Sequence, residues 1–185
     1  MRRLFFIVVA CALLLDQATK IWVRIAADGV EGRSLYELWP GVFELKLVYN
    51  EGIAFGMLQG AGVLLTPIAA LIAFGAAWYS LRHPDETRAT HFTMALLCAG
   101  ALGNLIDRIW DKRVTDMFWF RAIDFPVFNV ADVCITAAGV MLGVSVLGEL
   151  FHRGRQEGTG PRAEGQGPEV GAPVAPESDE DKAGV

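Results

Sequence analysis

The feature that most constrains this chain is a run of 21 residues, 61–81, that contains no charged side chain. A membrane-spanning helix needs about 20 consecutive apolar residues, so this run alone is long enough to cross a bilayer. Hydrophobic residues make up 53% of the 185-residue chain and the mean hydropathy is +0.37, which is more apolar than an ordinary soluble domain. The chain is therefore expected to fold in a membrane.

Three further apolar segments have the same character, but each carries polar residues at one end. We expect spans at about 4–24, 61–81, 92–108 and 130–150. If the chain passes up and down through the bilayer, the polar ends of the first, third and fourth spans lie at the same membrane face. Charged side chains are costly there and are kept for pairing or for function. That face collects Asp16, Lys20, Asn104, Asp107, Arg108, Asp116, Asn129 and Asp132.

The two loops at this face have different characters. In residues 28–60, the segment 43–49 alternates apolar and polar side chains, as a half-buried β-strand does, and the turn signal Asn50–Gly52 follows it. Residues 109–120 place aromatic side chains beside charged ones, which is typical of the headgroup level of a membrane. The sequence therefore predicts a small extracytoplasmic β-sheet between helices one and two.

Residues 154–185 are rich in Gly, Pro and Glu and contain few large apolar side chains. Such a composition cannot bury enough apolar surface to fold, so it predicts a disordered acidic cytoplasmic tail. The remaining residues, 1–153, are expected to form one all-α membrane domain with four transmembrane helices and the small sheet. The sequence shows no internal repeat that would divide this domain.

The orientation rests mainly on the amino terminus, because the Lys/Arg counts of the two sides nearly balance. We place both termini in the cytoplasm because Arg2 and Arg3 precede the first span and a hydrophilic tail follows the last. The same residues also fit the start of a secretory signal peptide. The apolar run continues past Cys11 to Leu15, and helix-forming residues continue to Val23, which favours a span that is retained.

Several kinds of chemistry find no support in the sequence. The net charge is −5, and no basic surface suggests a nucleic-acid partner. The three cysteines lie inside apolar runs without metal-ligand spacing, and the three histidines lie outside the polar cluster. There is no serine in a nucleophile elbow and no glycine-rich phosphate loop. If the chain is an enzyme, its carboxylates do the work.

Asp116 and Asp132 flank one short loop between two spans and are candidates for a catalytic pair. Two neighbouring carboxylates share a proton, which suits acid–base chemistry, and a helix start favours Asp132 as the ionised member. Structural explanations stay open for their neighbours. Asp16 and Lys20 have the spacing of a helical ion pair, and Asn129 can cap a helix with Asp132 at its third position.

Asn104 and Arg108 lie four residues apart, so they share one helix face and point at one target. The structural alternative is that Arg108 pairs with Asp107 or extends to the interface. Two other functions also remain open. A small ion or proton carrier would use intramembrane charges, although carriers usually hold them near the bilayer centre and have internal repeats. A membrane scaffold would use the charges only to assemble.

Five segments of the chain, in this order, resemble the motifs of a known family. They are Asp16-Gln17-Ala18-Thr19-Lys20, Asn50-Glu51-Gly52-Ile53-Ala54-Phe55, Gly100-Ala101-Leu102-Gly103-Asn104-Leu105-Ile106-Asp107-Arg108, Val114-Thr115-Asp116 and Phe128-Asn129-Val130-Ala131-Asp132. The family is lipoprotein signal peptidase, also called signal peptidase II, a bacterial membrane aspartyl peptidase. The resemblance covers about residues 4–150, with Ala99 standing where the family often has a glycine.

The resemblance implies a four-helix peptidase of the bacterial inner membrane, with its active site toward the extracytoplasmic face. Such enzymes remove the signal peptide from a prolipoprotein by cleaving just before a cysteine that carries a diacylglyceryl group. It implies prolipoprotein substrates and membrane lipids as partners and no metal or organic cofactor, and we expect a monomer. Carried onto this chain, the catalytic pair is Asp116 and Asp132, and the supporting or substrate-binding residues are Asp16, Lys20, Asn50, Gly52, Asn104, Arg108 and Asn129.

Overall fold

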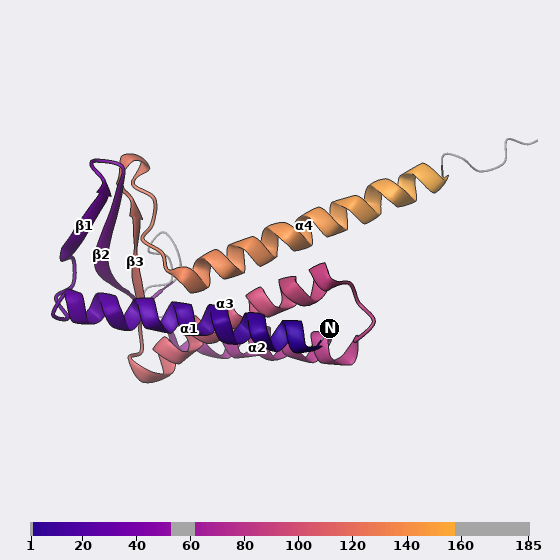
Figure 1. Ribbon diagram of the computed structural model, residues 1–185, viewed down its shortest axis with the longest axis horizontal. Coiled ribbons are helices and arrows are strands. Elements are labelled where there is room, and N and C mark those ends of the chain that lie inside the picture. Colours follow the sequence, from indigo (N-terminus) through magenta and orange to yellow (C-terminus); the bar gives the residue numbers. More distant parts are fainter. Residues whose placement is uncertain (1, 53–61, 158–185) are drawn as a thin grey trace, which may run out of the picture. The chain divides into compact units, whose positions relative to one another are not determined.

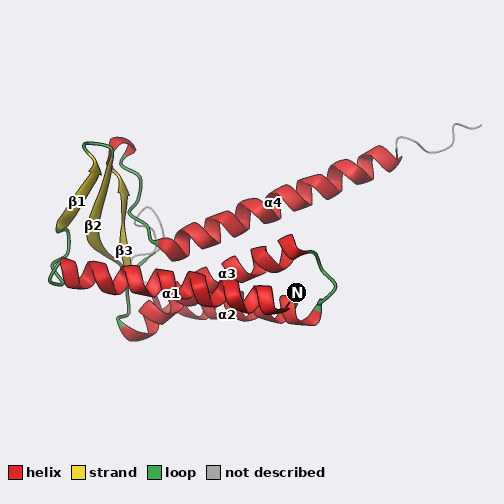
Figure 2. Cartoon of the chain, viewed as in Figure 1, coloured by secondary structure: helices red, strands yellow, loops and turns green. Residues whose placement is uncertain are grey.

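The computed structural model describes residues 2–52 and 62–157. The elements follow one another along the chain as shown in Figures 1 and 2. They are α1 (Arg2–Ala26), β1 (Ser34–Trp39), β2 (Phe43–Asn50), α2 (Gly62–Arg82), α3 (Arg88–Trp110), β3 (Val114–Phe120), the short 3₁₀-helix η2 (Arg121–Ile123) and α4 (Val130–Glu157). This confirms the expected fold class of four apolar helices with a small sheet.

The four helices are long and apolar enough to cross a membrane. The candidate spans are 2–26, 65–82, 88–110 and 130–150, which agree with the expected spans to within four residues. Their outward faces expose large apolar side chains such as Leu71 and Phe74 of α2, as a lipid-facing surface does. The motif residues Ile53-Ala54-Phe55 and residues 158–185 of the predicted tail lie outside the described residues, so the disordered tail stays a prediction.

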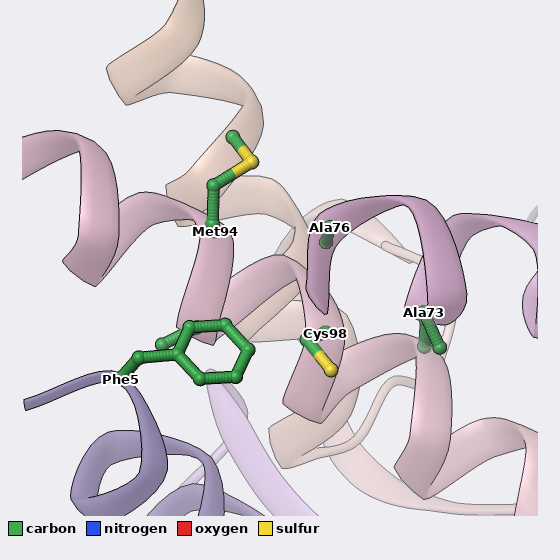
Figure 3. Close-up of a cluster of buried hydrophobic side chains, with 7 residues drawn as sticks. Phe5, Ala73, Ala76, Met94 and Cys98 are labelled. Atoms are coloured by element: carbon green, nitrogen blue, oxygen red, sulfur yellow. The ribbon is translucent and has the colours of Figure 1, made fainter. Parts of the chain in front are cut away.

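Helix α3 packs against both α1 and α2. Figure 3 shows the cluster at their contact, in which Phe5 of α1 lies near Met94 and Cys98 of α3 and Ala73 and Ala76 of α2. Small residues let helix backbones approach closely, which is the main source of helix association where lipid removes the hydrophobic drive. The result is an apolar contact that joins α3 to both α1 and α2.

The sheet has the strand order β1-β2-β3 and is antiparallel throughout (Figure 1). The expected strand is present as β2, and Leu45 and Leu47 are buried as its pattern predicts, but Glu44 is buried as well, so the alternation holds only in part. The third strand was not expected, since residues 114–120 lie between α3 and α4 and lack an alternating pattern. Their first four side chains are all buried, so apolar residues face both sides of the strand. This strand brings Asp116 opposite Val48 of β2.

Two glycines of α3 allow its backbone to lie close to α4 and α1. A Cβ added at Gly100 would lie 2.5 Å from the carbonyl oxygen of Ala131 in α4, and one at Gly103 would collide with the carboxylate of Asp16 in α1. The glycines of α4 behave differently. A Cβ added at Gly139 or Gly143 would meet nothing within 4 Å among the described residues, although small residues four apart often mark tight helix packing in membranes.

We therefore expect Gly103→Ala to destabilise the protein, because the added methyl group must displace a buried carboxylate. Overpacking of this kind costs about 1–3 kcal/mol of the free energy of unfolding. The measurement is thermal unfolding in detergent. Gly139→Ala is the matched control, since its methyl group enters open space and alanine favours a helix. Equal stability of Gly103→Ala and the parent chain would contradict the close approach.

Candidate active site

The site is built around a buried lysine. Lys20 Nζ lies 2.9 Å from Asp16 Oδ2 and 3.1 Å from Asp107 Oδ2, and all three side chains are at most 1% exposed. Asp16 is one helical turn before Lys20 on α1, which is the favourable order for an ion pair, whereas Asp107 comes from α3. The ion pair expected from the sequence is therefore confirmed, and a second carboxylate joins it.

Asp16 also holds the start of α4. Its Oδ1 accepts a hydrogen bond from the backbone N–H of Ala131 at 2.9 Å, one of the donors that a helix leaves free at its first turn. The missing side chain of Gly103 leaves room for this carboxylate. One residue thus neutralises Lys20 and fixes α4 to α1, a structural role that places the neighbouring Asp132.

Asn104 and Asn129 connect Lys20 to the carboxylate pair through hydrogen bonds. Lys20 Nζ donates to Asn104 Oδ1 at 3.0 Å, and Asn129 Nδ2 donates to the same oxygen at 3.1 Å. Because its oxygen accepts both bonds, the Asn104 amide nitrogen faces the other way and donates to Asp132 Oδ1 at 2.8 Å. The positive charge of Lys20 therefore orients Asn104 and, through it, Asp132.

Asn129 and Asp132 form the capping arrangement that the sequence predicted. Asp132 N donates to Asn129 Oδ1 at 2.9 Å, and Asn129 N donates back to Asp132 Oδ2 at 3.1 Å. Both bonds satisfy backbone donors at the start of α4. The structural and functional alternatives are compatible here, because the amide nitrogen of Asn129 remains free of the cap and donates elsewhere.

That amide nitrogen donates to Asp116 Oδ1 at 2.6 Å, and Asn50 Nδ2 of β2 donates to Asp116 Oδ2 at 3.1 Å. Asp116 is 2% exposed. Burial, and after it the negative charge of Asp132, raises the pKa of Asp116 to about 7, while the two asparagine bonds and the charge of Lys20 act in the opposite direction. Asp116 therefore holds a proton at a pH where an ordinary aspartate does not.

Arg108 and Gly52 meet at the same end of the molecule. Arg108 Nη2 donates to Gly52 O at 3.2 Å, and Gly52 N donates to Asn50 Oδ1 at 2.9 Å, which closes the turn after β2. Asp107 accepts from Lys20 and Arg24 instead of Arg108. The alternative in which Arg108 pairs with Asp107 is therefore wrong.

A cavity of about 670 Å³ lies beside the carboxylate pair. Six of the nine predicted site residues line it, namely Asn50, Gly52, Asn104, Arg108, Asp116 and Asp132. The other three, Asp16, Lys20 and Asn129, are buried behind this wall and hold it in place. The rest of the lining is almost entirely apolar and comes from α2, α3, α4, Val114 of β3 and the segment 125–128. The cavity therefore has a small polar end and a long apolar wall.

Part of the network lies outside the nine predicted site residues. Arg24 Nη2 lies 2.9 Å from Asp107 Oδ1, and Thr115 also bonds to both residues. Arg24 ends the expected span 4–24 and is not among the predicted site residues, whereas α1 continues past it to Ala26. The spacing Asp16, Lys20, Arg24 repeats every four residues and places all three on one helix face, which is a signal that could have found it.

Metal binding has no support from the described part of the chain. Within residues 2–52 and 62–157, no three His, Cys, Asp or Glu side chains are grouped so that they could hold a metal ion. The buried carboxylates of Asp16 and Asp107 instead have Lys20 and Arg24 as partners. The polar side chains that line the cavity include the carboxyl groups of Asp116 and Asp132 with their amide and guanidinium neighbours.

Four spans, and a polar site where α1, α3, β3 and α4 meet, define a multi-pass membrane protein with paired carboxyl groups at a largely apolar cavity. Residues 8–148 match the family model described as signal peptidase (SPase) II, so the chain belongs to the signal peptidase II family and is a peptidase.

Curated relatives agree with this assignment. The lipoprotein signal peptidase of Gloeobacter violaceus is 39% identical over 143 residues, which cover 77% of this chain and 81% of that protein. The lipoprotein signal peptidase of Symbiobacterium thermophilum is 41% identical over 128 residues, which cover 68% of this chain and 82% of the relative. The similarity therefore covers at least two thirds of this chain and four fifths of each of these two relatives.

A solved structure has the same fold. It is described as a bacterial membrane enzyme determined by the in meso method at 2.3 Å resolution, and it superimposes on this chain with a TM-score of 0.71 at 27% identity. The superposition covers 79% of this chain and 88% of that one. A second such enzyme, at 1.9 Å resolution, gives a TM-score of 0.67 at 28% identity and covers 77% of this chain and 92% of that one.

The buried ion cluster predicts a strong effect on stability. Lys20→Met should lower the free energy of unfolding by about 3–5 kcal/mol, because it leaves Asp16 and Asp107 buried with less compensating charge. Thermal unfolding in detergent measures this. Lys112→Met removes the same charge from an exposed side chain and should unfold like the parent chain. Equal losses in the two variants would contradict the central role of Lys20.

Proposed function

We propose that this peptidase is an aspartic endopeptidase that removes the signal peptides of diacylglyceryl-modified prolipoproteins by cleaving before the lipid-modified cysteine. Asp116 and Asp132 are its catalytic pair. The observation that carries the proposal is that the buried carboxyl group of Asp116 and the half-buried one of Asp132 face one cavity and are bound by the same asparagine, Asn129. Membership of the signal peptidase II family supports the reaction and gives no support to an ion or proton carrier.

The two carboxyl groups take different roles because their surroundings differ. Asp132 lies in the first turn of α4, where the helix dipole stabilises a negative charge, and we assign it the ionised form. Asp116 has a pKa raised to about 7 by burial and by the charge of Asp132, and we assign it the proton. A pair with unequal proton affinity can supply a base and an acid at once.

Peptide hydrolysis then proceeds without a covalent intermediate. Asp132 removes a proton from a water molecule, whose oxygen forms a bond to the scissile carbonyl carbon. Asp116 donates its hydrogen to the oxygen of that carbonyl, where negative charge develops. When the tetrahedral intermediate collapses, the C–N bond breaks, Asp116 regains its proton, and the proton held by Asp132 passes to the leaving amine.

The shape of the cavity suits a substrate that is part peptide and part lipid. The apolar side chains of Leu65, Ile68 and Ile72 on α2 line one side, and the segment 125–128 contributes Phe125 and Phe128. Acyl chains can bury their surface against such a wall. At the other end, Arg108 and Gly52 lie beside Asp116 and offer polar groups for the peptide backbone.

We further propose that the protein resides in the inner membrane as a monomer, with both termini cytoplasmic and the site toward the extracytoplasmic face. Arg2 and Arg3 at the start of α1 support the cytoplasmic terminus. The polar residues occur late in α1 and α3 and early in α4, which fits one membrane face when the helices alternate in direction. The small sheet would then lie at that face with the catalytic pair.

The catalytic pair is tested with Asp116→Asn and Asp132→Asn. Each variant should lower kcat by at least about 100-fold, because it removes one proton donor or acceptor while keeping a similar shape. The measurement is cleavage of a purified diacylglyceryl-modified prolipoprotein by detergent-solubilised enzyme. Asp124→Asn is the matched control, since Asp124 is an exposed aspartate on the same loop.

The experiment distinguishes an error in the proposed reaction from an error in the proposed catalytic pair. If the parent chain does not cleave the lipid-modified substrate, the proposed reaction is wrong. If the parent chain cleaves it and either aspartate variant retains substantial activity, the catalytic pair is wrong. Thermal unfolding of each variant shows whether a loss of activity is a loss of folding.

The raised pKa of Asp116 predicts an alkaline limit to catalysis. Since Asp116 must be protonated to donate to the carbonyl oxygen, the competent fraction is high below pH 7 and falls as the pH rises through about 7. The plot of kcat/KM against pH, which reports the free enzyme, should therefore show a descending limb with an apparent pKa near 7. A kcat/KM that keeps rising through this range would mean that Asp116 acts in its ionised form.

A further inference from the structure

The residue before Asp116 is held at all three of its polar groups. Thr115 N donates to Asp107 Oδ2 at 3.0 Å, and its Oγ1 accepts from Arg24 Nε at 2.7 Å. Its carbonyl oxygen accepts from Asn129 Nδ2 at 3.3 Å. Thr115 is fully buried, so no water substitutes for these partners. The backbone that carries Asp116 is therefore fixed by side chains from α1, α3 and the start of α4.

The pairing of β3 with β2 restrains the backbone next to Asp116 less than a regular ladder would. The pairing of β2 with β3 shifts register between the pairs Leu45–Phe118 and Val48–Asp116, so the ladder is irregular next to Asp116. The N–H and carbonyl groups of Thr115 bond to helix side chains. A regular ladder fixes a strand by its own backbone bonds, whereas an irregular one bends and needs other contacts.

We infer that Arg24 and Asp107 are positioning residues of the active site, which act through Thr115 to set where the Asp116 carboxyl group lies. The inference rests on the proposed function, because it assigns these residues to the same reaction. Neither of them lines the cavity. Their effect on catalysis passes through the backbone of β3.

The geometry of Arg24 fits this role better than that of a simple surface charge. One guanidinium group contacts three partners, with Nε on Thr115 Oγ1, Nη2 on Asp107 Oδ1 at 2.9 Å and Nη1 on Asp111 Oδ2 at 3.1 Å. The planar fork of arginine holds two acceptors in fixed directions, which a lysine cannot do. Thr115 Oγ1 is an uncharged acceptor, so its hydrogen bond orients the guanidinium group and adds little electrostatic attraction.

The three contacts also provide an internal control. Asp107 is 1% exposed, whereas the side chain of Asp111 is 41% exposed. Asp111→Asn removes only the exposed ion pair of Arg24. Such a pair contributes little to stability. Thr115→Val removes only the hydroxyl acceptor and keeps the shape of the side chain. Arg24→Gln removes the guanidinium group and with it all three contacts, to Thr115, Asp107 and Asp111.

The test measures kcat and KM for cleavage of a diacylglyceryl-modified prolipoprotein by the full chain in detergent. Arg24→Gln and Thr115→Val should each lower kcat by about tenfold or more, with KM changed by less than about twofold, because substrate contacts are unaltered. The double variant should lose no more than the worse single variant, since both break one connection. Thr115→Ser should restore most of the activity, whereas Arg24→Lys should not.

Asp111→Asn should match the parent chain in kcat, KM and thermal unfolding. The inference is overturned if Arg24→Gln and Thr115→Val keep the parent kcat, or if their losses multiply in the double variant. It is also overturned if a lower kcat only follows a lower fraction of folded enzyme. These outcomes differ from failure of the proposed function, in which the parent chain does not cleave the substrate or Asp116→Asn still does.

Discussion

The structure depends on the burial of one positive charge between two negative ones. Lys20 is inaccessible to solvent and is contacted by Asp16 from its own helix and Asp107 from α3. A buried ion is tolerated only when its partners satisfy it fully, so these three side chains specify how α1 and α3 lie against each other. Asp16 extends the arrangement to α4 and Asp107 extends it to β3. Through these contacts the ion cluster positions the two elements that carry the carboxylate pair, α4 with Asp132 and β3 with Asp116.

Much of the fold could be predicted because lipid imposes a strict rule on sequence. Each span needs a long apolar run, and such runs are visible without any tertiary information. Local chemistry was equally visible where it depends on spacing within one helix. The pair Asp16–Lys20 and the cap formed by Asn129 and Asp132 both follow from positions three or four residues apart. Predictions of this kind needed only the geometry of one helix.

Contacts between elements were harder to predict. Nothing in the sequence indicates that Lys20 meets Asp107, because the two residues are brought together only by the packing of α1 on α3. The strand β3 was missed because both of its faces are buried, which removes the alternation that marks a half-exposed strand. Arg24 is absent from the predicted site because its partners Asp107 and Thr115 are brought to it only by the packing of α3 and β3. Each error arose where tertiary packing, and not local pattern, decides the outcome.

The dispersal of the site along the chain has a consequence for how the enzyme is made. Its polar groups come from α1, the turn after β2, α3, β3 and the first turn of α4. A nascent chain that has inserted only three spans has one of the two acidic groups and no Asn129 to join them. With the proposed pair as the catalytic groups, the active site is complete only once the fourth span has joined the other three.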